Sequence, residues 1–177
     1  EEVFDRLLTW NRWWQENRDQ DGYLCWGSNP YDPRFDDRRE MVQNEFKAAS
    51  FESGLDNTPM YDGMPFDTTT HLMQLADVGL MGMYIGDCEA LAEMADILDR
   101  TDAAKELRDR AEKYRTKLKT LWDDDFGLFL NKRLDIGELS RRISPTNFYA
   151  LIGNAATQEQ AERMIDEHFY NPQEFRG

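Results

Sequence analysis

Between residues 101 and 121, apolar residues recur at alternating steps of three and four, and this spacing most constrains how the chain can fold. The apolar positions are Ala104, Leu107, Ala111, Tyr114, Leu118 and Leu121. These steps place the side chains on one face of an α-helix, because the helix repeats every 3.6 residues. Thr101 is the predicted N-cap, since its hydroxyl can accept a hydrogen bond from the first turn. A chain built on this segment has to bury that helix face against another element.

The same periodicity predicts further helices, over residues 1–19, 38–46, 91–98 and 147–152. The run from Asp67 to Ile85 is apolar on several faces, which predicts a deeply buried helix. Thr157 and Gln160 form a capping-box pattern for a last helix that reaches about His168. The stretch WDDDFGLFLN, residues 122–131, interrupts the helices and predicts short extended structure.

Helical segments joined by alternating long and short connections predict an all-α fold of antiparallel hairpins. The 177 residues suit one domain or part of a larger one, and the 40% of hydrophobic residues can supply a core. A formal charge of −14 repels phosphate backbones and anionic membranes, so we expect neither nucleic acid nor a membrane as partner. The chain starts with Glu1 and not with methionine, which leaves its compartment open.

The stretch FESGLDNTPMYDGM, residues 51–64, fits neither a helical nor a strand period. A glycine and a proline flank Asp56, so a rigid irregular loop can hold this carboxyl at a fixed point and partly desolvate it. Desolvation raises a carboxyl pKa, as a general acid near neutral pH requires, and the charge of Glu52 would act in the same direction. The alternative, which the residues alone favour, is that Asp56 and Asn57 are turn residues that cap the loop.

Aromatic side chains crowd the first third of the chain. Aromatic rings together with amides and carboxylates suit a sugar, because rings stack on its apolar face and polar groups hold its hydroxyls. Core packing is the alternative, and we favour it for Trp10 and Trp14, which lie at helical spacing. Trp26 and Tyr61 lie in predicted loops, where both interpretations stay open.

Residues 17–23, NRDQDGY, match the first half of a calcium-binding loop. Asn17, Asp19 and Asp21 have the spacing of the first three ligands, and a glycine follows. Ser28 stands where such a loop requires a glutamate. We therefore favour a plain turn and expect no cofactor, with Asp19 and Asp21 as weak calcium candidates.

The motif FESGLDNTPMYD resembles the signature of glycoside hydrolase family 63, a group of inverting α-glucosidases and related enzymes. Its E-S-G-x-D core also resembles the trehalases of family 37, where a tryptophan usually stands in place of Leu55. The sequence L-D-N-(S/T)-P favours family 63. Three further stretches support this resemblance. WNRWWQENRDQDGYLCWGS is similar to the family's early helix with its active-site loop, and WDDDFGLF is similar to its W-D-x-x-x-G-x-(F/Y) break. The family's later hairpin is similar to SPTNFYALIGNAATQEQAERMIDEHFYNPQEF.

The resemblance implies an (α/α)6 toroid, of which residues 1–177 would form a single partial catalytic domain with the acid loop at about residues 47–66. It carries the general-acid role onto Asp56, in an inverting hydrolysis that releases a terminal α-linked sugar, with glucose expected. The substrate would be an oligosaccharide or disaccharide.

The resemblance also gives roles to four neighbours of the acid. Glu52 and Asn57 would shape the loop or bind sugar hydroxyls, and Trp26 and Tyr61 would bind the sugar.

In the family the general base is a glutamate far downstream of the segment that ends at Gly177. We therefore expect residues 1–177 to carry the acid without the base and to be inactive alone. Helix faces left uncovered, above all in residues 67–85, would favour self-association. Two alternatives remain: a non-catalytic helical domain that binds carbohydrate or protein, and a trehalase-like hydrolase.

Overall fold

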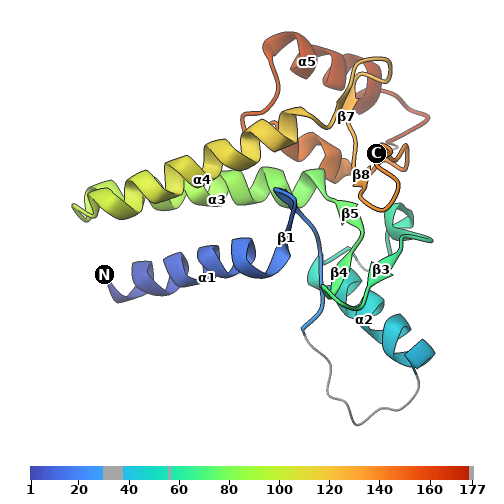
Figure 1. The fold of residues 1–177 in the computed structure, drawn as a ribbon. Coiled ribbons are helices and arrows are strands. Elements are labelled where there is room, and N and C mark those ends of the chain that lie inside the picture. Colours follow the sequence, from blue (N-terminus) through green and yellow to red (C-terminus); the bar gives the residue numbers. More distant parts are fainter. Residues whose placement is uncertain (30–37, 56, 176–177) are drawn as a thin grey trace.

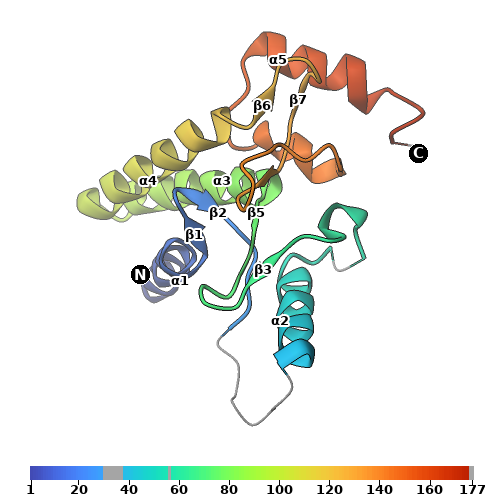
Figure 2. The same ribbon diagram turned by 45° about the vertical axis from the view of Figure 1, so that its right-hand side comes forward.

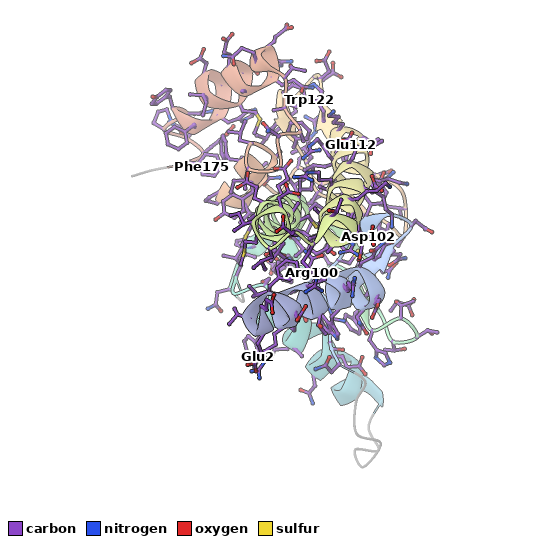
Figure 3. The ribbon with its side chains drawn as sticks, turned by 90° about the vertical axis from the view of Figure 1, so that its left-hand side faces the viewer. Glu2, Arg100, Asp102, Glu112, Trp122 and Phe175 are labelled. Atoms are coloured by element: carbon purple, nitrogen blue, oxygen red, sulfur yellow. The ribbon has the colours of Figure 1, made fainter. Side chains whose placement is uncertain are left out.

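The computed structural model describes residues 1–29, 38–55 and 57–175. At its centre α3 (Val78–Ile97) and α4 (Thr101–Lys119) form an antiparallel helical hairpin, as Figures 1 and 2 show. Helix α1 (Glu2–Arg18) runs along one side of this hairpin. Helix α2 (Arg38–Glu52) lies on the same side, near the end of the hairpin where α3 begins. Figure 3 views α3 and α4 nearly end-on, with α1 on one side and the C-terminal helix on the other.

The C-terminal part is built from short helical turns. The 3-10 helix η2 (Pro145–Ala150) packs against α3, and α5 (Gln158–Arg163) continues into the π-helical turn η3 (Met164–Phe169). The predicted capping box is confirmed: the Thr157 hydroxyl accepts from the Gln160 amide at 3.2 Å, and the Gln160 side chain accepts from the Thr157 amide at 2.9 Å. The helix predicted over residues 147–152 is a 3-10 turn that starts two residues earlier, at a proline.

Within the described residues, strands of two residues each form four antiparallel pairs: β1 (Asp19–Gln20) with β2 (Tyr23–Leu24), β3 (Phe66–Asp67) with β4 (Leu72–Met73), β5 (Leu75–Ala76) with β8 (Lys132–Arg133), and β6 (Trp122–Asp123) with β7 (Leu128–Phe129). The β6–β7 pair confirms the extended structure predicted for residues 122–131. In the part of the chain that the structure describes, no helix is both long and apolar enough to cross a membrane.

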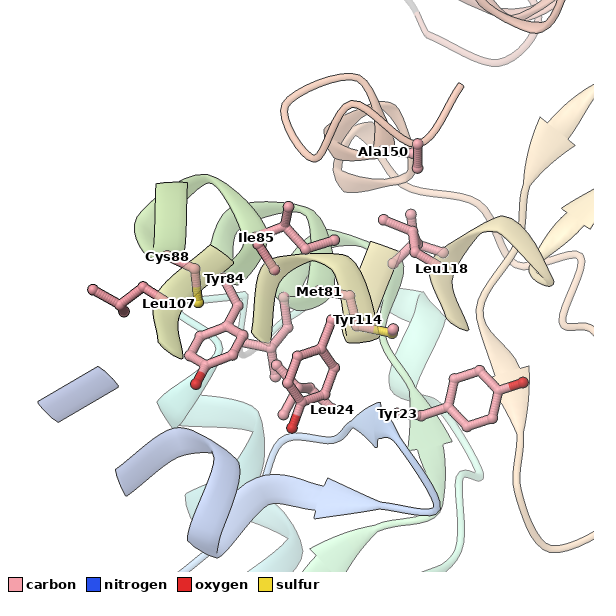
Figure 4. Close-up of a cluster of buried hydrophobic side chains, with 14 of the residues drawn as sticks. Tyr23, Leu24, Met81, Tyr84, Ile85, Cys88, Leu107, Tyr114, Leu118 and Ala150 are labelled. Atoms are coloured by element: carbon pink, nitrogen blue, oxygen red, sulfur yellow. The ribbon is translucent and has the colours of Figure 1, made fainter. Parts of the chain in front are cut away.

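The interface between α3 and α4 forms the centre of the main hydrophobic core, shown in Figure 4. The apolar positions predicted for α4, Leu107 and Leu118 among them, are buried there. The rings of Tyr84 and Tyr114 meet edge to face, with their centroids 5.2 Å apart. Thr101 is the first helical residue and not the N-cap that we predicted, because the chain enters the helix one residue earlier, at Arg100.

The helix predicted over residues 67–85 is wrong in its first half. Helix α3 begins at Val78 and continues unbroken to Ile97, so it also contains the separate helix predicted over residues 91–98. The stretch 66–76 instead contains the short strands β3, β4 and β5 and the turn between β3 and β4. Strands β4 and β5 are buried on both faces, so their sequence lacks the alternation that distinguishes a strand from a buried helix.

The expectation that residues 67–85 would expose apolar faces holds only at Met83, which is 56% exposed, whereas Leu72, Leu75 and Ile85 are each at most 3% exposed. Trp10, which we predicted to lie in the core, is 55% exposed. The large exposed hydrophobic side chains lie above all on α1, on α3 and near the C-terminus: Val3, Trp10, Met83, Ile97, Phe169 and Tyr170. Self-association stays a prediction that now depends on these residues.

Candidate active site

The predicted acid loop, about residues 47–66, is helical in its first part, because α2 continues to Glu52, and the irregular part runs from there to β3. Helix α2 reaches Glu52, further than the 38–46 predicted, so the helix directly supports the start of the loop. The Ser53 hydroxyl donates to the Ser50 carbonyl at 2.6 Å and accepts from the Leu55 amide at 3.0 Å, which fixes the chain as it leaves the helix. Asp56 itself lies outside the described residues.

The far end of the loop is anchored in the interior. Pro59–Tyr61 form the 3-10 turn η1, capped by the Thr58 side chain, and Met60 and Tyr61 are 2% and 3% exposed. The Asn131 side-chain amide donates to the Met60 sulfur at 3.2 Å. On the outside, the Arg142 guanidinium donates to the Asp62 carbonyl. The loop is therefore held on both sides of position 56 by buried and surface contacts.

Glu52 joins three segments at the start of the loop. Its carboxylate accepts two hydrogen bonds from the buried Arg18, at 2.8 and 2.7 Å, and a third from the Gly27 amide at 2.8 Å. The Arg18 guanidinium also lies over the Trp13 ring, 4.6 Å from its centroid. Gly27 leaves room for this arrangement, because a Cβ there would lie 2.7 Å from the His71 carbonyl oxygen. Of the two roles that the resemblance allowed, these contacts favour loop shaping for Glu52.

Trp26 and Tyr61 converge on one buried carboxylate. The Trp26 indole donates to Oδ2 of Asp77 at 3.0 Å, and the Tyr61 hydroxyl donates to the same oxygen at 3.3 Å. Burial raises the pKa of the Asp77 carboxyl above its usual value, although the Leu80 amide, Trp26 and Tyr61 all donate to it. Burial also raises the pKa of the Tyr61 hydroxyl, and the charge of Asp77 adds to this, so Tyr61 stays a neutral donor.

A sequence model of one family, described as the mannosylglycerate hydrolase MGH1-like glycoside hydrolase domain, matches residues 1–177. The chain belongs to this glycoside hydrolase family. No curated protein matches the sequence closely enough to count as a relative.

Solved structures of similar fold include members of the same enzyme class. A GH63 mannosylglycerate hydrolase from Thermus thermophilus in complex with glucose superposes with a TM-score of 0.70 at 19% identity, over 95% of this chain and 44% of that one. An uncharacterized conserved protein from the same organism gives a TM-score of 0.72 at 19% identity, over 95% of this chain and 46% of that one. The neutral trehalase Nth1 from Saccharomyces cerevisiae gives 0.61 at 22% identity, over 75% and 25%.

These likenesses confirm the predicted fold class, part of an (α/α)6 toroid, and the resemblance to family 63 with a more distant one to trehalases. The chain spans less than half the length of each of these structures.

In this glycoside hydrolase chain, three of the predicted site residues belong to one connected set of contacts. Glu52 binds the backbone directly after Trp26, and Trp26 and Tyr61 share Asp77. Asn57 is an exposed residue of the loop itself. Asp77 was not predicted from the sequence, although an aspartate directly before an apolar run is a recognisable N-cap signal.

The calcium candidates Asp19 and Asp21 lie in the β1–β2 hairpin, which precedes Trp26 in the sequence. The Asp19 carboxylate accepts from the Gly22 amide at 2.8 Å, from Lys113 at 2.9 Å and from the Tyr114 hydroxyl. Burial raises the pKa of Asp19, but these hydrogen bonds and the Lys113 charge outweigh it and lower the pKa below its usual value. Among the described residues, no three His, Cys, Asp or Glu side chains gather as a metal site. A carboxylate already shared by a lysine and a tyrosine does not fit a calcium ligand, and Asp21 fits a turn, with a positive φ of 56°.

Proposed function

We propose that the protein is an inverting α-glycosidase in which Asp56 is the general acid. The observation that carries this proposal is the family match across the whole chain, which includes the E-S-G-x-D loop. The contacts on both sides of position 56 support it, because a catalytic carboxyl must be held to within a fraction of an ångström.

In this mechanism Asp56 protonates the glycosidic oxygen as the bond to the anomeric carbon breaks. A second carboxylate activates water on the opposite face of the sugar, and in inverting enzymes the two carboxyl groups lie roughly 6.5–9.5 Å apart. We place that base outside residues 1–177, as the resemblance to family 63 implies, so we expect these residues to be inactive alone. The two carboxyl groups carry both proton transfers of the proposed reaction.

We propose a terminal α-linked sugar as the substrate, with glucose as the first expectation. Trp26 is half-buried, with its indole N–H bound to Asp77, so its ring is held in one orientation beside the loop. A fixed ring can stack on the apolar face of a sugar, and Asn57 on the exposed side of the loop can bind a hydroxyl. The structures of similar fold carry the names mannosylglycerate hydrolase and trehalase, so both of those substrates belong in the test panel.

The test is hydrolysis by the natural full-length protein that carries residues 1–177. The panel contains trehalose, other α-linked glucobioses and mannosylglycerate, and each is assayed for released monosaccharide. We expect turnover of at least one member, and a fall in kcat of about 10²–10⁴-fold in Asp56→Asn, because general-acid catalysis contributes about this much. Near wild-type turnover by a folded Asp56→Asn variant would contradict the assignment. Activity on trehalose alone would instead make the protein a trehalase-like hydrolase.

A further inference from the structure

We propose that Asp77 is a positioning residue of the active site, whose carboxylate joins Tyr61, in the second half of the acid loop, to Trp26, which directly precedes the glycine that binds Glu52. This inference rests on the proposed function, in which Trp26 stacks on the sugar, while the buried Tyr61 closes the turn that follows Asp56 in the loop. Asp77 contacts neither the sugar nor the reacting atoms in this proposal, and it acts through the two residues that it binds.

The two oxygens of Asp77 have different partners. Oδ1 accepts from the Leu80 amide at 2.8 Å and so caps the start of α3. Oδ2 accepts from the Trp26 indole and the Tyr61 hydroxyl, which lie 51 and 16 residues away in the sequence. The first oxygen thus serves the helix, and the second joins two distant segments.

Capping alone explains neither the carboxylate nor its burial. The caps at Ser144 and Thr157 use a single hydroxyl that stays within its own turn. Asp77 is 1% exposed, and among the described residues no lysine, arginine or histidine forms an ion pair with it. A buried carboxylate without a cation is costly, so its presence favours a task that a serine cap cannot perform.

The positions of the two donors connect this carboxylate to both ends of the loop. Tyr61 closes the η1 turn, five residues after Asp56 in the sequence. Trp26 directly precedes Gly27, whose amide binds Glu52 at the start of the loop. The rings of Trp26 and Trp14 also meet edge to face, with their centroids 5.7 Å apart, so the Trp26 ring has a supported orientation. Loss of the shared acceptor would release both ends together.

Asp77→Asn separates the two tasks, because it keeps the volume and one acceptor oxygen. If the amide oxygen caps α3, its NH2 group faces the indole N–H, and a donor then meets a donor. If the amide turns round, the NH2 group faces the Leu80 amide instead. We expect kcat/KM to fall by about 10- to 100-fold in the folded variant, since misplacement of about 1 Å can cost about 100-fold.

The experiment measures kcat and KM for the full-length protein and five variants, on the substrate found in the panel, at a temperature where circular dichroism shows every variant folded. The variants are Asp56→Asn, Asp77→Asn, Tyr61→Phe, the Asp77→Asn/Tyr61→Phe double variant and Asp123→Asn. Asp123 is the matched control, because its carboxylate also accepts from a backbone amide in a turn, that of Phe126, in the β6–β7 pair.

We expect Asp123→Asn to keep wild-type kcat/KM. The double variant should be no slower than Asp77→Asn alone, because both substitutions act on the same hydrogen bond between Tyr61 and Asp77, so their losses are not independent. A folded Asp77→Asn variant with wild-type kcat/KM, or additive losses in the double variant, would overturn the positioning role. An inactive wild-type protein would instead overturn the proposed function, and the positioning role would fall with it.

Discussion

The α3–α4 hairpin and the acid loop with its supporting strands are held together by different forces. The hairpin buries Leu107, Leu118 and the edge-to-face pair of Tyr84 and Tyr114, so it depends on many small apolar contacts. The loop region depends on a few buried polar groups, of which Glu52 and Asp77 each accept three hydrogen bonds.

This difference has consequences for mutation. An apolar interface loses stability in proportion to the volume removed, while the geometry of a distant site is kept. A buried polar set loses its geometry when one acceptor disappears, because the remaining donors stay buried without a partner. The two regions should therefore respond differently: the hairpin in stability, and the loop region in both stability and turnover.

The largest effect on stability is expected for Glu52→Gln. The Arg18 side chain is 4% exposed and would lose its charged partner, which costs about 3–5 kcal/mol for a buried pair. Urea denaturation measures the loss in the free energy of unfolding, and kcat/KM should fall as well. Glu2→Gln is the matched control, since the Glu2–Arg6 pair is about 80% exposed on both sides and should contribute under about 1 kcal/mol. Equal losses in both variants would contradict the distinction.

The next largest effect is expected for Leu107→Ala, which opens a cavity in the hairpin. Leu107 is fully buried, and such a truncation costs about 2–5 kcal/mol. We expect unchanged kcat/KM at temperatures where the variant is folded. Ile97→Ala on α3 is the control, because Ile97 is 82% exposed and its loss should stay within about 0.5 kcal/mol. A specific loss of turnover in folded Leu107→Ala would show that the two regions are not separable.

The smallest effect is a pH dependence at the contact between α1 and α4. Hydrogen bonds from Arg12 lower the pKa of Glu106 to about 2, and Arg110 adds to this. A carboxyl with a lowered pKa in the folded state contributes stability above its ordinary pKa and loses it as the pH falls from about 4.5 towards about 2. We expect Glu106→Gln to flatten the stability profile in this window, as measured by denaturant unfolding at several pH values. An unchanged slope would contradict the assignment.

Much of the hairpin could be predicted from the sequence, because a helix with one buried face carries a period of 3.6 in its own residues. The apolar steps from Ala104 to Leu118 place α4 almost to the residue. The start of α3 could not be placed, because β4 and β5 are buried on both faces and carry no period. Trp10 has helical spacing yet is exposed, since spacing alone does not tell which of two adjacent apolar stripes faces the core.

For the candidate site, the sequence predicted the motif that carries the acid, but it did not predict the contacts that hold the motif in place. The E-S-G-x-D stretch identifies Glu52 and Asp56 as neighbours in sequence. Asp77 depends on Trp26 and Tyr61, whose approach follows from the way α2, β3 and β4 fold back on the β1–β2 segment. Contacts over such separations leave no periodic signal in a single sequence.

The most direct test of the central claim is the anomeric configuration of the first sugar released by the full-length protein. Proton NMR of the hydrolysis of an α-linked substrate, recorded before mutarotation, separates the two anomers, with Asp56→Asn as the control. We predict early β-sugar from the wild-type protein and none from the variant, because water attacks from the face opposite to the leaving group. Early α-sugar, or β-sugar formed equally well by the variant, would contradict an inverting glycosidase with Asp56 as its acid.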